Sequence, residues 1–426
     1  LPISNAEPLL PFIDYLFTST SAVCVTGLST LVVQTQFTLF GKIIMIILMQ
    51  IGGLGLMTLI AIFLIYVEGK LSLSTKVAMS EAVNRSNFDD FHHFIRAIIK
   101  YTIFFEFLGF LSLSTRFIPE YGVAEGLFNA LFISVSAFCN AGFDPFGASS
   151  LSMYVSDPVV ILTVASLIVM GGLGFGVWFD ISQGSKLILK GKQRIRYVVK
   201  HFQVHVKLVI LMTVSLIVSG FILFFVFEMN NPDTMAHLSL MDKILNALFH
   251  SITLRTAGFS LLNIGMMRTY TLLFMMLYMI IGGSPGGTAG GFKTTTFAIL
   301  ILMVMAELKG KDSITVFSRK IEREQFRRAF IIVVILLSIL FVGILLLSMT
   351  EGFELTQIAF EAASAIGTVG LSTGITPDLS YFGKWIIILL MFIGRIGPLT
   401  MILSININST KKGLEVNYPK ADILIG

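Results

Sequence analysis

The sequence has 426 residues, of which 55% are apolar and only 13% are charged, and its formal net charge is +5. Soluble globular domains are about 45–50% apolar and about 25% charged. A chain of this composition lacks the polar side chains that a water-exposed surface requires. The composition therefore excludes an ordinary soluble protein and indicates an integral membrane protein.

In chain order, the first elements that the sequence predicts are long apolar segments. They cover residues 40–66, 97–115, 159–179, 208–227, 271–306, 329–349 and 385–407. Most of them have the roughly 20 residues that cross a bilayer core of about 30 Å. Segment 271–306 is too long for one span, since it would form a helix of about 54 Å at 1.5 Å per residue. We expect it to break at its glycine-rich run, residues 282–291, where irregular backbone within a membrane must line a cavity or contact protein.

The polar linkers between these segments predict the orientation of the chain. Linkers 68–100, 181–207, 307–328 and 408–426 hold 22 of the 30 Lys and Arg residues. The connections that alternate with them are acidic. The positive-inside rule therefore predicts that the basic linkers face the cytoplasm. The acidic connections would then face outside, where they would enrich cations or simply be solvated loops.

A short sequence unit recurs four times on the predicted outer side. Each copy begins at a phenylalanine and ends at a glycine, in residues 17–27, 132–142, 249–258 and 360–370. The terminal glycines Gly27, Gly142, Gly258 and Gly370 lie 112 to 116 residues apart. Four matched copies at such even spacing indicate an internal repeat.

Each copy is typical of a half-helix that enters the membrane from outside and leads into an extended strand of small residues. Carbonyl oxygens on four such strands can replace the hydration shell of a cation, and glycine permits the backbone angles that aim them. For a single copy, a helix-breaking turn without a role in a pore is the competing interpretation. The set of four favours a pore. The predicted filter, through its backbone carbonyls, consists of Cys24, Val25, Thr26, Gly27, Cys139, Asn140, Ala141, Gly142, Arg255, Thr256, Ala257, Gly258, Gly367, Thr368, Val369 and Gly370.

A second repeated feature predicts a gate below this filter. Three copies have a Gly-Gly pair in the apolar segment that follows the filter. The fourth copy has Arg395 in place of the second glycine. The four pairs are Gly52-Gly53, Gly171-Gly172, Gly282-Gly283 and Gly394-Arg395. A charge inside an apolar helix marks a transport pathway by default, so we interpret Arg395 as a cationic plug or latch, with a structural salt bridge as the alternative. Arg255 is expected to brace the third filter loop from behind. The predicted gate residues are Gly282, Gly283, Ser284, Pro285, Gly286, Gly287, Gly290, Gly291, Lys293 and Arg395.

The sequence does not favour an enzyme. Gly286–Thr294 superficially resembles a phosphate-binding loop, but Phe292 separates its glycine from its lysine, and the run lies inside an apolar segment. No nucleophile–base set or carboxylate pair stands out, and we expect no covalently bound cofactor. The intramembrane acids Glu106 and Asp180 leave a sodium- or proton-coupled secondary transporter open as the alternative to a channel.

The four filter endings, the Gly282–Thr296 stretch and the run 392–400 resemble the Trk/Ktr/HKT superfamily of potassium transporters, in particular its KtrB-type membrane subunits. The resemblance implies an all-α integral membrane fold of four helix–pore loop–helix repeats around one central pore. The repeats would be residues 1–67, 68–183, 184–310 with an intramembrane gating loop at 282–296, and 311–426. The first helix of the first repeat is apparently missing before Leu1.

The same resemblance implies potassium uptake across the plasma membrane. Potassium would bind at Gly27, Gly142, Gly258 and Gly370, and glycine in the first repeat is the potassium-selective form. The family also implies a homodimer within the lipid bilayer, a KtrA-like cytoplasmic ring of nucleotide-binding regulatory subunits docked on the basic linkers, and sodium as an activator. The tail at residues 421–426 would pack at the dimer contact. No nucleic-acid partner is expected.

Overall fold

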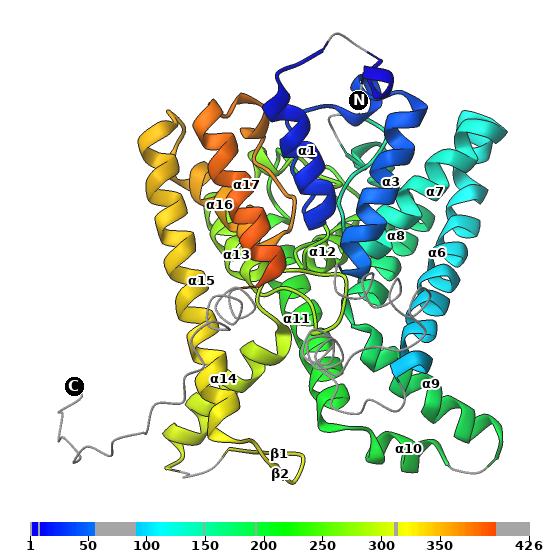
Figure 1. Ribbon diagram of the computed structural model, residues 1–426, viewed down its shortest axis with the longest axis vertical. Coiled ribbons are helices and arrows are strands. Elements are labelled where there is room, and N and C mark those ends of the chain that lie inside the picture. The colour runs from blue at the N-terminus through cyan, green and yellow to red at the C-terminus, as the bar shows by residue number, and fades with distance from the viewer. Residues whose placement is uncertain are drawn as a thin grey trace.

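The computed structural model describes residues 2–6, 9–55, 91–147, 150–191, 194–310 and 314–397, and these residues are mostly helical. The parts of the predicted segment 40–66 beyond Gly55, of linker 68–100 before Phe91 and of segment 385–407 beyond Gly397 lie outside the described residues, as do linker 408–426 and the tail 421–426. Figure 1 shows short helices at the centre, with the longer α6 and α15 toward the sides.

The helices follow the order that the repeat predicts. The first repeat contains α1 (Phe12–Cys24) and α3 (Leu39–Leu54), and the second contains α6 (Phe91–Tyr121), α7 (Val123–Cys139) and α8 (Pro158–Gly172). The third contains α11 (Val204–Glu228), α12 (Leu240–Thr253), α13 (Thr269–Ile280) and α14 (Thr294–Leu308), and the fourth contains α15 (Arg323–Thr350), α16 (Leu355–Gly367) and α17 (Tyr381–Ile396). The exact repeat boundaries stay a prediction.

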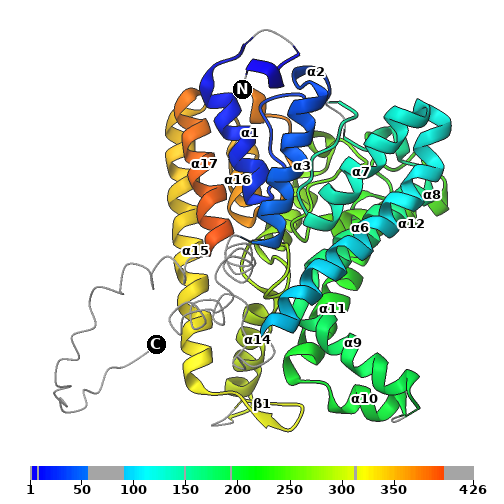
Figure 2. The same ribbon diagram turned by 45° about the vertical axis from the view of Figure 1, so that its right-hand side comes forward.

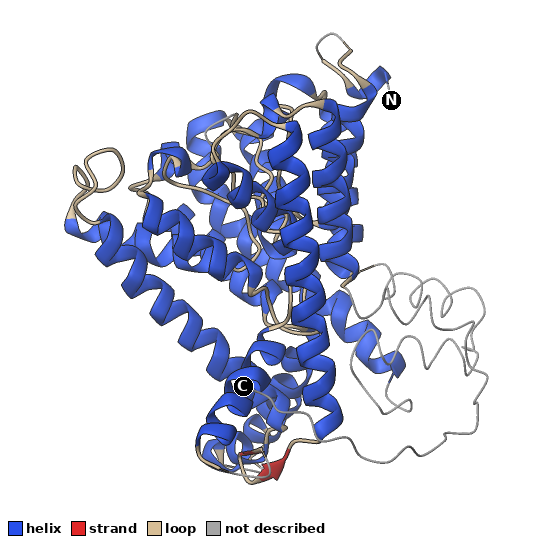
Figure 3. Ribbon diagram, turned by 90° about the vertical axis from the view of Figure 1, so that its left-hand side faces the viewer, coloured by secondary structure: helices blue, strands red, loops and turns tan. Residues whose placement is uncertain are grey.

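The remaining elements are short or connect the repeats. They are η1 (Pro2–Ser4), α2 (Val33–Gln36), η2 (Ser152–Tyr154), α9 (Phe175–Leu189), α10 (Ile195–His201), η3 (Ile264–Met266), η4 (Thr376–Asp378), β1 (Thr315–Val316) and β2 (Arg319–Lys320). The two strands form an antiparallel hairpin that pairs Thr315 with Lys320. Figures 2 and 3 show α9, α10 and this hairpin at the end of the molecule opposite the N-terminus.

Polar side chains fix where several of the apolar helices begin. The Asp157 side chain accepts hydrogen bonds from the first N–H groups of α8, and the Ser380 hydroxyl accepts one from Gly383 in α17. Thr38 and Ser239 cap α3 and α12 in the same way. These N–H groups have no partner within the helix, so a capping oxygen stabilises the helix start at the edge of an apolar segment.

Two of the predicted spans are interrupted. The break expected in segment 271–306 is confirmed, because α13 ends at Ile280 and α14 begins at Thr294. The apolar segment 159–179 is also interrupted, because α8 and α9 meet at an angle of 95°. Gly174, with φ +92°, stands just before the first residue of α9 there. Linker 181–207 is correspondingly helical over much of its length, in α9 and α10.

The outer surface of the long helices is apolar. Leu211, Val218, Phe341 and Met349 on α11 and α15 are 49–76% exposed. By length and composition, α11 and α15 are the described helices that could each cross a bilayer, and the bent α8–α9 pair could be a third span. A band of exposed large apolar side chains on such helices fits contact with lipid rather than with water.

The core of the molecule lies around the four helices that hold the repeated unit, which we call the central helices: α1, α7, α12 and α16. The phenylalanines that open the sequence repeat, Phe17, Phe132, Phe249 and Phe360, are all 0% exposed. The helix that follows the repeated unit in each copy packs against the central helix of the next copy: α3 on α7, α8 on α12, α13 on α16 and α17 on α1. This order closes on itself, so the four repeats surround a common centre.

A buried ion pair accompanies the closure between the fourth repeat and the first. Lys384 Nζ at the start of α17 lies 2.6 Å from Asp14 Oδ1 at the start of α1, and the two side chains are only 13% and 8% exposed. Removing one partner would leave the other charge buried and uncompensated. The pair therefore fixes how the two ends of the described chain meet.

Candidate functional site

The four central helices end in the same backbone turn. Val25, Asn140, Thr256 and Thr368 have φ between 51° and 64°, although none of them is glycine. Two residues further on, Gly27, Gly142, Gly258 and Gly370 have φ of 72–99°. Left-handed backbone at a residue with a side chain costs free energy and persists where the surrounding structure imposes it. Four equivalent copies of this turn make the sequence repeat a structural one.

The four terminal glycines lie side by side in a closed ring. A methyl group added to each glycine would lie within 2.0–2.8 Å of a carbonyl oxygen from another repeat. In each case the oxygen belongs to the residue immediately before the neighbouring glycine. The four contacts are Gly27 with Ala141, Gly142 with Ala257, Gly258 with Val369 and Gly370 with Thr26. The chain order of the repeats is thus their order around the ring, and only glycine fits at these positions.

A hydroxyl in the last turn of each short helix holds the strand that follows. In the first and fourth repeats it accepts a hydrogen bond from the N–H of the ring glycine, and in the second and third it donates to the carbonyl of the next residue. The pairs are Ser21–Gly27 (3.0 Å), Ser136–Phe143 (2.6 Å), Thr253–Phe259 (2.7 Å) and Ser364–Gly370 (3.0 Å). Sequence reasoning missed these residues, although a Ser or Thr stands four residues after the repeat phenylalanine in every copy.

The other predicted filter residues are buried around this ring. Cys24, Val25, Thr26, Cys139, Asn140, Ala141, Arg255, Thr256, Ala257, Thr368 and Val369 are at most 3% exposed. Both cysteines are free thiols. The Arg255 side chain turns toward α11, where Nη2 lies 3.4 Å from the Thr213 hydroxyl. That Arg255 braces the third filter loop stays a prediction.

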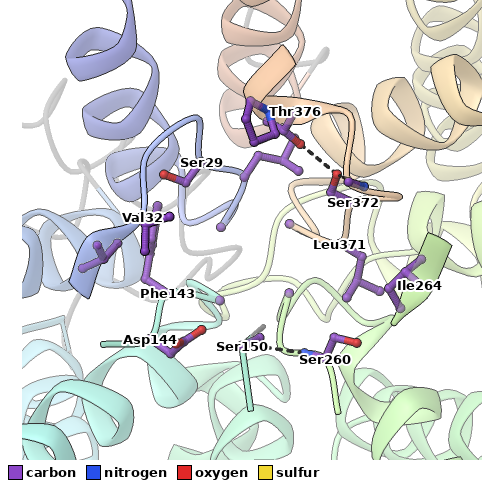
Figure 4. A pocket seen from close by; sticks show the side chains of 18 of the residues that line it. Ser29, Val32, Phe143, Asp144, Ser150, Ser260, Ile264, Leu371, Ser372 and Thr376 are labelled. Carbon is purple, nitrogen blue, oxygen red and sulfur yellow. Dashed lines mark hydrogen bonds between the residues drawn. The ribbon is translucent and has the colours of Figure 1, made fainter. Parts of the chain in front are cut away.

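A cavity of about 600 Å³ lies against the four ring glycines. Figure 4 shows its lining, which comes from the loops that follow the ring in all four repeats and includes Ser29, Asp144, Ser260 and Ser372. The carbonyl-bearing C-terminal ends of the four central helices lead directly into the ring, and helix C-termini carry partial negative charge. Backbone oxygens, helix ends and one carboxylate thus give this region a polarity that favours cations.

Apart from Arg395, which lies on α17, the predicted gate residues form a loop between α13 and α14 that packs against the break between α8 and α9. Backbone hydrogen bonds join Ser284 N–H to the Gly172 carbonyl at 2.9 Å and Thr288 N–H to the Gly171 carbonyl at 3.2 Å. The Gly286 carbonyl in turn accepts from Phe175 N–H at 2.9 Å. The loop that interrupts the third repeat is therefore held by the bent α8–α9 pair. Its glycine run, Gly282–Gly291, lies beside the glycine run of the second repeat, Gly171–Gly174.

The two predicted gate cations bind backbone carbonyl oxygens. Lys293 Nζ donates to the carbonyl of Ala289, within its own loop, at 2.8 Å. The Arg395 guanidinium donates to the carbonyl of Thr288 in the loop and to the carbonyl of Gly52 at the end of α3. Arg395 therefore joins three repeats, and among the described residues no carboxylate forms a salt bridge with it.

Gly171, at the end of α8, lies against the backbone of the central helix α7. A methyl group at Gly171 would lie 1.9 Å from the Phe138 carbonyl oxygen, whereas one at Gly172 would meet nothing closer than 3.6 Å. We expect Gly171→Ala to destabilise the protein by about 1–3 kcal/mol. Gly172→Ala, the matched control, should leave stability unchanged or improve it through helix propensity. The thermal unfolding midpoints of both variants in detergent test this expectation, and equal midpoints would contradict it.

These features define a helical membrane protein built from four pore-loop repeats. The chain belongs to the TrkH family of cation transport proteins, whose sequence model matches residues 1–412. The resemblance predicted from the filter endings is therefore confirmed, together with the all-α membrane fold.

Similar proteins cover almost the whole chain. It is 39% identical to Ktr system potassium uptake protein B of Bacillus subtilis, over 100% of this chain and 92% of the relative. It is 38% identical to the potassium/sodium uptake protein NtpJ of Enterococcus hirae, over 97% of this chain and 90% of that protein. The crystal structure of the potassium transporter TrkH from Vibrio parahaemolyticus shares the fold, with a TM-score of 0.73 at 18% identity, covering 94% of this chain and 79% of the other.

Proposed function

We propose that this chain conducts potassium ions into the cell, as the membrane subunit of a Ktr-type uptake system. The observation that carries the proposal is the closed ring in which each glycine touches the carbonyl of the residue before the neighbouring glycine. Such carbonyls can replace the hydration shell of a potassium ion. The name of the Bacillus subtilis relative, a potassium uptake protein, supports this choice of ion, whereas the name of the Enterococcus hirae relative specifies both potassium and sodium.

Selectivity in this proposal resides in the backbone of the four strands. The sixteen predicted filter residues supply the oxygens, and potassium is the substrate rather than a resident cofactor. The four hydroxyls at the ends of the central helices support the proposal, because they fix the strands from behind. Arg255 would position the third strand without facing the ion, since its side chain is directed at α11.

The loop between α13 and α14 is the proposed gate. It would close the pathway below the filter, with Lys293 holding its shape and Arg395 tying it to α3. The two carbonyl contacts of Arg395 favour a latch over a salt bridge. Glycines permit the large backbone rotations that an opening loop requires.

The proposal includes a cytoplasmic partner and a defined orientation. Lys186, Lys190, Arg194, Arg196 and Lys200 gather in α9, α10 and their connection, at the end of the molecule opposite the N-terminus. The positive-inside rule would place this end in the cytoplasm of a plasma-membrane protein. A KtrA-like nucleotide-binding ring would dock there on a homodimer of this chain, and sodium would act as an activator.

Ion flux in liposomes tests the proposed function. Purified protein in vesicles should carry potassium at least about tenfold faster than sodium, driven by the potassium gradient alone. Empty vesicles are the control. Equal rates for the two ions would contradict the selectivity proposed here. Flux that stops without a sodium or pH gradient would instead establish a coupled secondary transporter.

A further inference from the structure

The residue two positions after each ring glycine borders the cavity. In three repeats this residue is a serine that lies within hydrogen-bond distance of its own central helix. The partner is always the residue that follows the repeat phenylalanine. The pairs are Thr18–Ser29 (3.4 Å), His250–Ser260 (3.4 Å) and Glu361–Ser372, in which the Ser372 hydroxyl donates to Glu361 Oε1. These contacts brace three of the four post-filter loops.

The second repeat departs from this pattern. The equivalent pair is Ile133 and Asp144, and the fully buried Ile133 side chain has no polar atom to offer. The Asp144 carboxylate instead accepts a hydrogen bond from Phe146 N–H at 2.9 Å, within its own loop. Asp144 thus takes the place of the bracing serine in the second repeat. Among the described residues, its carboxylate has no hydrogen bond to the central helix α7.

Asp144 also supplies the only ionisable side chain among the described residues that line the cavity. The other polar side chains there are neutral hydroxyls and an amide, as the labelled serines in Figure 4 illustrate. The ionisable side chains that contact the cavity serines of the other repeats, His250 and Glu361, are at most 1% exposed. No basic side chain among the described residues that line the cavity neutralises the carboxylate, so its field acts on ions that approach the ring.

We propose that Asp144 is an outer cation-binding residue, which holds a partly hydrated monovalent cation in the cavity before the cation enters the ring of glycines. The inference rests on the proposed conduction of potassium and deepens it by assigning the entry site. A single off-centre carboxylate concentrates cations without providing the several acidic ligands that a divalent ion prefers.

If Asp144 only stabilises its own loop, removing its charge should leave potassium transport unchanged. Two substitutions separate this structural role from cation binding. Asp144→Asn keeps an oxygen that can accept from Phe146 N–H but removes the charge. Asp144→Ser gives the second repeat the residue that the other three have. Asp233→Asn is the control, because Asp233 is an exposed acid of the same sign elsewhere in the described outer loops and does not line the cavity.

Potassium flux in proteoliposomes is measured against potassium concentration at neutral pH. We expect both Asp144 variants to raise the half-saturating potassium concentration about five- to tenfold, with little change in maximal flux, and Asp233→Asn to match the wild type.

Two outcomes would contradict the proposed role of Asp144, and a third would contradict the proposed conduction of potassium. If the wild type carries potassium and Asp144→Asn has the same half-saturating concentration, Asp144 is structural and the entry site is wrong. If Asp144→Asn matches the wild type while Asp144→Ser fails, the loop hydrogen bond is what matters. A wild type that carries no potassium would overturn the proposed conduction itself.

Discussion

Replacing Gly370 with alanine is expected to abolish potassium uptake while leaving the protein folded in the membrane. The added methyl group would lie 2.0 Å from the Thr26 carbonyl oxygen and 2.9 Å from the Gly27 Cα. Both neighbours are backbone atoms of the first strand, so they cannot move aside as a flexible side chain would. A loss of about 3 kcal/mol in ion coordination slows permeation roughly a hundredfold.

A matched control separates this overlap from the cost of left-handed backbone. Gly374, four residues further along the same loop, has φ +104°, close to the +94° of Gly370, but an added methyl group there would meet nothing within 4 Å. Gly374→Ala therefore has a similar backbone penalty without a contact in the ring. Uptake should be measured in cells that lack their own potassium transport. Comparable uptake by the two variants would mean that the ring does not limit transport.

Replacing Arg395 with alanine is expected to raise potassium flux in vesicles that lack a cytoplasmic partner. The substitution removes both hydrogen bonds of the guanidinium, to the Thr288 and Gly52 carbonyls. Hydrogen bonds from charged groups contribute about 1.5–3 kcal/mol each. If they stabilise the closed loop, losing even one shifts the closed–open equilibrium by about tenfold or more. An unchanged flux would return Arg395 to a structural role.

Two further variants distinguish a latch from an electrostatic plug. Arg395→Lys keeps the positive charge but cannot reach two carbonyls with one planar group. Lys293→Ala removes a positive charge from the same loop, yet its only described contact is the Ala289 carbonyl within that loop. A latch predicts that Arg395→Lys raises flux like Arg395→Ala and that Lys293→Ala has a smaller effect. A plug predicts that Arg395→Lys behaves as the wild type.

The repeat was predictable from the sequence because its chemistry is local. The phenylalanine that opens each copy and the glycine that ends it are fixed by burial and by backbone angle, and both requirements appear as residue types at constant spacing. The third copy is one residue shorter, between Thr253 and Gly258, and its glycine still occupies the ring. The interruption at 282–291 was predictable for the same reason, because its glycines and Pro285 exclude a continuous helix.

Contacts between distant segments were not predictable. The bend between α8 and α9 was missed, since Met170–Gly174 reads as part of one apolar segment and its break depends on docking with the loop at Ser284–Thr288. The carbonyl partners of Arg395 come from two other repeats, so a single helix gives no sign of them. Asp144 was one of several outer acids in the sequence, and only the cavity distinguishes it.

The central claim is that backbone oxygens of four equivalent loops surround one cation. Thallium, which mimics potassium and scatters anomalously, tests it directly in crystals of the protein. We expect an anomalous peak on the axis enclosed by Gly27, Gly142, Gly258 and Gly370, coordinated by carbonyl oxygens of all four strands. Thallium that binds elsewhere while this axis stays empty, in crystals that diffract well enough to show it, would contradict the account.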